Sequence, residues 1–160
     1  MYVANGFTLL ELMVVCALLA TLAGLGAAQL AHWHWRTQYH TEVMSIRAHV
    51  ESAKARAQLQ QQDTWLGVTP TCLWIADHDQ ADCASAAVYT RPQALAWRAE
   101  FAGGSLLRFT AGRGMAGFSA GRLVVSDTRF RDHQTHLVVS ALGRLRLCQD
   151  SSLLSQVPVC

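Results

Sequence analysis

The chain begins with a long apolar stretch and then takes on a helical periodicity. Between residues 7 and 31 the only charged residue is Glu11. Beyond residue 31, apolar residues recur at steps of three and four, which places them on one face of a helix. These residues are Trp35, Tyr39, Val43, Ile46, Val50, Ala53 and Ala57. Since no proline interrupts residues 7–63, the pattern predicts one continuous helix of about 55 residues.

After residue 63 the apolar positions alternate with polar ones, and glycines separate the segments. Leu95, Trp97 and Phe101 alternate with Arg98 and Glu100, which is typical of a strand with one buried face. Short apolar segments that are separated by glycine-containing turns follow at residues 106–109, 123–125, 137–139 and 145–147. The fold class predicted is α+β, with a long N-terminal helix packed on an antiparallel β-sheet head.

The apolar stretch is long enough to cross a membrane. At 1.5 Å per residue, a helix over residues 7–31 measures about 37 Å, against about 30 Å for a hydrocarbon core. We therefore predict a transmembrane half of the helix at residues 7–31, an amphipathic half at 32–62 and one β-rich head at 63–160. Residues 1–6 precede the membrane span.

Glu11 distinguishes among the alternatives for this stretch, because a carboxylate in a membrane span is costly. A secretory signal peptide has a basic start and a short apolar centre, whereas residues 1–6 contain no Lys or Arg and the apolar run is longer. A plain transmembrane anchor fits the length but leaves Glu11 unexplained. The third alternative is a prepilin.

The sequence Gly6-Phe7 followed by Glu11 resembles the type III signal of type IV pilins and pseudopilins. The resemblance implies cleavage after Gly6 by prepilin peptidase, N-methylation of Phe7 and assembly with other pilins through the N-terminal helix. In a filament, Glu11 of one subunit can pair with the terminal amine of a neighbour, so that neither charge stays unpaired in an apolar environment. The chain would lie in the inner membrane before assembly, with its head in the periplasm, and afterwards in a pilus at the cell surface.

Five cysteines divide into one in the membrane span, Cys16, and four in the head. An even set in a domain outside the cytoplasm predicts two disulfides. Three pairings are possible, and we favour the local one, Cys72 with Cys83 and Cys148 with Cys160. A zinc site is the rival, but no CxxC pair supports it.

The formal net charge of +2 conceals a basic C-terminal half, in which residues 84–160 hold nine arginines and four acids. The segment Gly143-Arg144-Leu145-Arg146 stands out there. On a strand, Arg144 and Arg146 share one face and lie about 6.6 Å apart along the chain. Two guanidinium groups so placed suit successive phosphates of a nucleic acid, and the alternative is an ordinary solvated strand face.

The prepilin signal, the long helix, the β-rich head and the late GRxR strand together resemble the FimT/GspH family of minor pilins and pseudopilins. The GRxR element is similar to that of the FimT branch, whose C-terminal region binds DNA in natural transformation. The resemblance implies that Gly143 shapes a turn and that Arg144 and Arg146 contact phosphates of sequence-tolerant, double-stranded DNA. Arg129 and Arg131 are further candidates, although acids flank both.

The sequence does not favour an enzyme, a cofactor or a metal site. Residues 112–117 fit GxGxxG, but no helix follows, so we interpret them as a flexible loop. The seven histidines form no ligand spacing, and no nucleophile–base pattern stands out. The rival to DNA binding is therefore structural: a minor pilin or pseudopilin that primes assembly in a type IV pilus or a type II secretion system.

Overall fold

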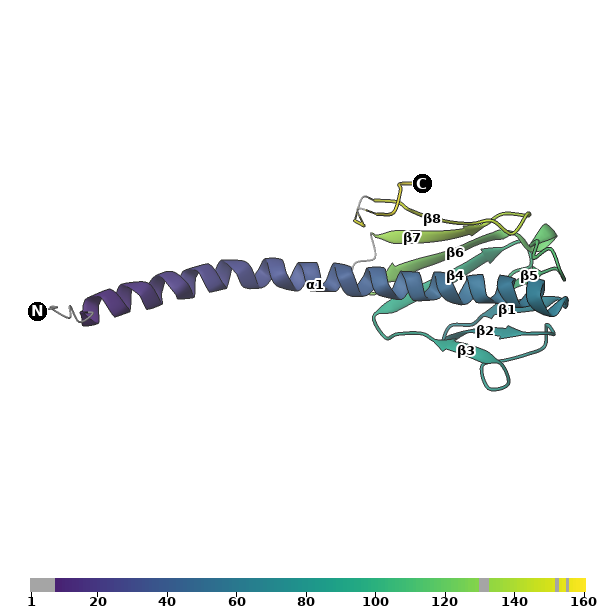
Figure 1. The fold of residues 1–160 in the computed structure, drawn as a ribbon, viewed down its shortest axis with the longest axis horizontal. Coiled ribbons are helices and arrows are strands. Elements are labelled where there is room, and N and C mark those ends of the chain that lie inside the picture. The colour runs from purple at the N-terminus through teal and green to yellow at the C-terminus, as the bar shows by residue number, and fades with distance from the viewer. Residues whose placement is uncertain (1–7, 130–132, 152, 155) are drawn as a thin grey trace, which may run out of the picture. The chain divides into compact units, whose positions relative to one another are not determined.

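The computed structural model describes residues 8–129, 133–151, 153–154 and 156–160, with the backbone alone at residues 25–28. In this part of the chain one long helix, α1 (Leu9–Gln60), precedes eight strands and the short 3₁₀ helix η1 (Gly117–Ser119) (Figure 1). The chain divides into two compact units, an N-terminal one up to residue 38 and a C-terminal one at residues 39–160. Helix α1 is continuous over 52 residues, which confirms the single helix predicted.

The N-terminal unit consists of the first part of α1, and its apolar side chains are exposed. Leu9 is 77% exposed and Leu22 is 65% exposed. Thr8 caps the helix, because its hydroxyl accepts a hydrogen bond from the backbone N–H of Glu11 at 3.2 Å. By length and composition, α1 is the one helix of the described residues that can span a membrane. The predicted processing residues Gly6 and Phe7 lie outside the described residues.

The C-terminal unit contains two antiparallel four-stranded sheets. The first sheet has the order β3-β2-β1-β5 and consists of β1 (Thr64–Val68), β2 (Cys72–Ala76), β3 (Ala87–Thr90) and β5 (Leu106–Phe109). The second sheet has the order β4-β6-β7-β8 and consists of β4 (Leu95–Phe101), β6 (Gly121–Asp127), β7 (Gln134–Val139) and β8 (Leu145–Gln149).

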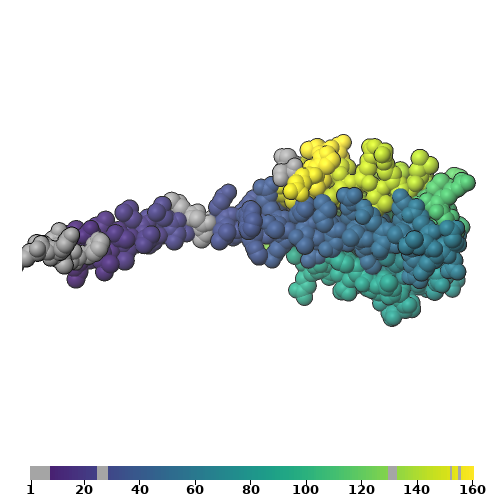
Figure 2. All heavy atoms as spheres, in the orientation of Figure 1, coloured from purple at the N-terminus to yellow at the C-terminus, as the bar shows by residue number. Residues whose placement is uncertain are grey.

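Helix α1 fills the core between residues 39 and 57, where its predicted apolar stripe is buried. Six of the seven stripe residues, from Tyr39 to Ala57, belong to one cluster with side chains of both sheets. The hydroxyl of Tyr39 donates to the carbonyl of Val125 at 3.1 Å and to the hydroxyl of Thr135 at 2.9 Å. In Figures 1 and 2 this part of the helix has β1–β3 (teal) on one side and the C-terminal strands (yellow-green) on the other.

The sequence pattern did not reveal strands β1 and β2, and the structure gives the reason. All five residues of β2 are buried, so neither strand alternates in polarity. A second apolar cluster covers the other face of this sheet, where Trp74 packs with Ala81 from the acidic loop that follows β2. The loop at residues 77–82 keeps its carboxylates exposed but also shields a strand face.

The glycine-rich segment 110–117 closes the end of α1. The N–H of Gly112 donates to the carbonyl of Ala57 at 3.0 Å, which satisfies one of the carbonyls left open at the helix C-terminus. Thr110 and Met115 close the segment on itself through a hydrogen bond of 2.9 Å between their backbones. The segment is a loop as expected, and it packs against both the helix end and the turn between β7 and β8.

Candidate nucleic-acid interface

The turn between β7 and β8 is fixed by three hydrogen bonds of Ser140. Its N–H donates to the carbonyl of Arg144 at 3.0 Å, and its carbonyl accepts from the N–H of Gly143 at 2.8 Å. Its hydroxyl accepts from the N–H of Arg144 at 3.1 Å. The backbone of Arg144 is therefore held rigidly. We call β7, β8 and this turn the arginine hairpin.

Gly143 is required in this turn for two separate reasons. Its φ of +73° lies in the left-handed region that glycine adopts without penalty. A Cβ atom at this position would also stand 2.0 Å from the carbonyl oxygen of Gly114. A hydrogen bond of 2.8 Å from the N–H of Gly117 to the carbonyl of Ala141 holds the two loops together. The absence of a side chain at Gly143 thus lets the glycine-rich segment 110–117 pack directly against the arginine hairpin.

Arg144 and Arg146 are exposed, while Leu145 and Leu147 pack against the core. The alternation gives both arginines the same outward face, about 6.6 Å apart along the strand. No ion pair joins either guanidinium to an acid among the residues that the structure describes. Their charges are therefore available to an anionic ligand.

The other arginines on this sheet face are partly neutralised. Glu100 binds Arg98 on one carboxylate oxygen and Arg122 on the other, each at 2.6 Å. The hydrogen bonds from Arg122 and then Arg98 lower the pKa of the Glu100 carboxyl. One cross-strand row runs from Arg146 on β8 through Val138 to Arg122 on β6. Since Glu100 pairs with Arg122, the net positive charge of this face is greater at β8 than at β4.

Lys54 adds a cation from α1 that sequence reasoning did not assign to the site. It lines a hollow of about 430 Å³ together with Glu51, Leu142 and Arg144. Glu51 is already paired with Arg47 at 2.8 Å. No local signal could identify Lys54, because ninety residues separate it from Arg144. A neighbouring hollow of about 570 Å³ is lined by Val138, Ser140, Leu142, Arg144 and Arg146.

Arg129 belongs to a different environment from the arginine hairpin. Its guanidinium binds both carboxylate oxygens of the buried Asp127, at 2.8 and 3.0 Å, and this pairing raises the pKa of Arg129. Arg129 follows the end of β6 that is remote from the turn between β7 and β8. This end of the strand, at Asp127, lies about 16 Å along β6 from Arg122. The structure therefore does not bring Arg129 together with Arg144. Arg131, the other candidate, lies outside the described residues.

The four cysteines of the C-terminal unit form two local disulfides, the pairing that the sequence favoured. Cys72 bonds Cys83 across a Cα–Cα distance of 6.2 Å, and Cys148 bonds Cys160 across 5.0 Å. The second bridge fastens the C-terminus beside β8, where the N–H of Cys160 donates to the carbonyl of Gln149 at 2.9 Å.

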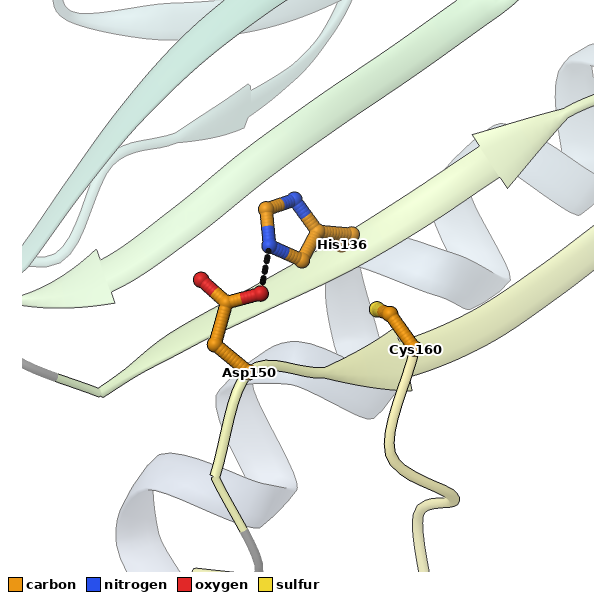
Figure 3. Close-up of side chains that lie close together, drawn as sticks. All are labelled: His136, Asp150 and Cys160. Atoms are coloured by element: carbon orange, nitrogen blue, oxygen red, sulfur yellow. Dashed lines mark hydrogen bonds and ion pairs between the residues drawn. The ribbon is translucent and has the colours of Figure 1, made fainter.

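His136, Asp150 and Cys160 lie close enough together to resemble a set of metal ligands (Figure 3). Metals bind the thiolate form of cysteine, however, and the sulfur of Cys160 is committed to its disulfide. The Nε2 atom of His136 is already 2.8 Å from a carboxylate oxygen of Asp150. We interpret this cluster as a structural contact that ties the C-terminus to β7.

Comparisons with known proteins gave one match for the N-terminal sequence and others for the fold. Residues 1–27 match the family model of the prokaryotic N-terminal methylation motif. A search of curated protein sequences finds no significant match.

Two crystal forms of the Pseudomonas aeruginosa type IV minor pilin FimU are structurally similar to the chain. The first has a TM-score of 0.57 at 16% identity and covers 70% of this chain and 89% of FimU. The second has a TM-score of 0.55 at 15% identity, with coverages of 68% and 90%. The minor pseudopilin EpsH from the Type 2 Secretion System of Vibrio cholerae has a TM-score of 0.50 at 15% identity, with coverages of 68% and 94%.

The chain therefore combines a prokaryotic N-terminal methylation motif with a type IV pilin-like fold. The motif and the apolar helix fit a membrane-anchored pilin that later enters a pilus, and a periplasmic head is consistent with them.

Proposed function

We propose that this protein is a minor type IV pilin that binds extracellular DNA through the arginine hairpin, for uptake in natural transformation. The observation that carries the proposal is the rigid, outward-facing pair Arg144 and Arg146, for which no acidic partner exists among the described residues. Lys54 extends the same cationic surface from α1. Contacts of this kind bind the phosphate backbone, so recognition is tolerant of sequence and sensitive to salt.

The proposal places the N-terminal helix in a filament with other pilins. Prepilin peptidase cuts between Gly6 and Phe7, Phe7 is methylated, and Glu11 pairs with the new amine of a neighbouring subunit. The position of Glu11 in the first turn of α1 supports this role, because the carboxylate lies near the end that would carry the amine. Mass spectrometry of the protein from its native host tests it: an unprocessed N-terminus excludes the assembly route.

DNA binding is tested with full-length protein in detergent micelles and a blunt duplex, titrated at several salt concentrations. The double variant R144Q/R146Q should bind more weakly, and the slope of log affinity against log salt should be shallower by about 2, one for each lost phosphate contact. R91Q/R98Q is the matched control: it removes the same charge, and Arg122 still neutralises Glu100. Equal salt slopes for the wild type and R144Q/R146Q would exclude the arginine hairpin as the binding site.

A second candidate function is favoured by the likeness to both a minor pilin and a minor pseudopilin. In it the protein primes the assembly of a pilus or a type II secretion filament and does not bind DNA. Loss of piliation or secretion in a deletion strain, together with wild-type protein that binds no duplex, would favour this function.

A further inference from the structure

A third hollow lies at the end of the C-terminal unit that carries the turn of the arginine hairpin. It has a volume of about 460 Å³ and is lined by Trp65 and Arg108 from the first sheet and by Gly103, Thr110, Phe118 and Ser119 from the loops. We call it the aromatic hollow. Two aromatic residues and a guanidinium group thus border a hollow that is open to solvent and large enough for a flat ring.

Phe118 is presented on a turn that is fixed by hydrogen bonds. Phe118 is fully exposed, at 101% of its reference area, and it sits in the middle of η1. Ser119 anchors this turn, because its hydroxyl accepts from the N–H of Arg108 at 2.9 Å and donates to the carbonyl of Ala116 at 2.7 Å. A large apolar ring held in water on a fixed turn is poised for a contact with a ligand.

Another part of the lining is a cation–π pair. The guanidinium carbon of Arg108 lies 5.5 Å from the ring centroid of Trp65, and Asp63 holds the guanidinium there through an ion pair. Nucleobases stack on aromatic rings and on guanidinium planes. Since Asp63 neutralises Arg108, the attraction for a polyanion comes from elsewhere.

The arginine hairpin supplies that attraction. Phe118 follows Gly117, whose N–H binds the carbonyl of Ala141, and Arg144 comes three residues later. The two side chains are therefore rooted within about 22 Å of each other, since successive Cα atoms are at most about 3.8 Å apart and the hydrogen bond joins the two loops. A few nucleotides of one strand span this distance.

We propose that the aromatic hollow receives an unpaired base at the end of a DNA duplex whose backbone lies on the arginine hairpin. This inference rests on the proposed function and deepens it, because it makes a DNA end with a single-stranded overhang the preferred ligand. Base–aromatic stacking of ordinary strength raises the affinity about tenfold per base. Blunt duplex binds through the cationic surface of Arg144, Arg146 and Lys54 and leaves the aromatic hollow empty.

The test uses full-length protein in detergent micelles and fluorescence anisotropy with three probes. These are a blunt duplex, the same duplex with a short thymidine overhang, and the same duplex with an abasic overhang of equal length and charge. The wild type should bind the thymidine overhang about tenfold more tightly than the abasic overhang. F118A should abolish this difference and leave the affinity for the blunt duplex unchanged.

L59A is the matched control, because Leu59 is also an exposed apolar residue, at 83%, but lines neither the aromatic hollow nor the hollows beside Arg144. It should retain the preference for the thymidine overhang. Equal binding of the thymidine and abasic overhangs, or a preference that persists in F118A, would overturn this inference while duplex binding stands. Failure of the wild type to bind any probe would instead overturn the proposed function. Loss of piliation in F118A with an unchanged overhang preference would assign the aromatic hollow to another subunit and also overturn the inference.

Discussion

Replacing Gly143 with alanine should destabilise the protein much more than the same change at Gly104. The two glycines have almost the same backbone conformation, with φ of +73° and +75°. Their surroundings differ: a Cβ at Gly104 meets nothing within 4 Å, whereas a Cβ at Gly143 would stand 2.0 Å from the carbonyl oxygen of Gly114. The pair therefore separates the cost of the conformation from the cost of the close contact.

The conformational cost is shared, at about 1 kcal/mol for an L-residue in the left-handed region. At Gly143 the arginine hairpin and the glycine-rich loop must also move apart. This separation strains the hydrogen bond from Gly117 to Ala141, and forcing an extra methyl group into a packed, buried contact costs about 1–3 kcal/mol. We therefore expect a loss of about 1 kcal/mol for G104A and about 3 kcal/mol for G143A.

Urea unfolding of full-length protein in detergent micelles, followed by tryptophan fluorescence, measures both losses. An unchanged dependence on urea concentration would show that the two variants unfold between the same states as the wild type. Equal losses in G104A and G143A would refute the reasoning, because the close contact between the loops would then contribute nothing.

Two further predictions concern buried and surface polar groups. Gln149 is buried, and its amide donates to the carbonyls of Leu154 and Val157 and accepts from the N–H of Leu154. Q149L should therefore lower the free energy of unfolding in urea by about 3 kcal/mol, and a decrease below about 1 kcal/mol would contradict this account. The N–H of Ala111 and then Arg108 lower the pKa of the Asp63 carboxyl from its ordinary value of 3.8. The stability from Asp63 is therefore present above pH 3.8 and lost as the pH falls through its lower folded value. The advantage of wild type over D63N should shrink in that acidic range in urea titrations, and a difference independent of pH would contradict the assignment.

Local patterns predicted the helix and the strands β4 to β8, but not the short strand β3. The spacing from Tyr39 to Ala57 identified the buried side of α1, and the segment at 106–109 coincides with β5. These patterns are readable because a side chain that faces solvent on one side must alternate with those that face the core.

Strands β1 and β2 were not readable in this way. The loop closed by the disulfide between Cys72 and Cys83 covers their second face, so apolar residues occupy both sides of the sheet. The alternation that marks a strand in a sequence is then absent. Whether a face is covered depends on a distant loop and not on the strand itself.

The sequence by itself determined the methylation motif, the apolar length of the first helix, and the two outward arginines of the GRxR segment. These are properties of neighbouring residues. Only the tertiary structure decided which arginines pair with acids from distant parts of the chain. Arg108 is bound to Asp63 and Arg122 to Glu100, whereas Arg144 has no acidic partner among the described residues and lines a hollow with Lys54. These pairings join segments far apart in the sequence, and the pairing of the strands selects them.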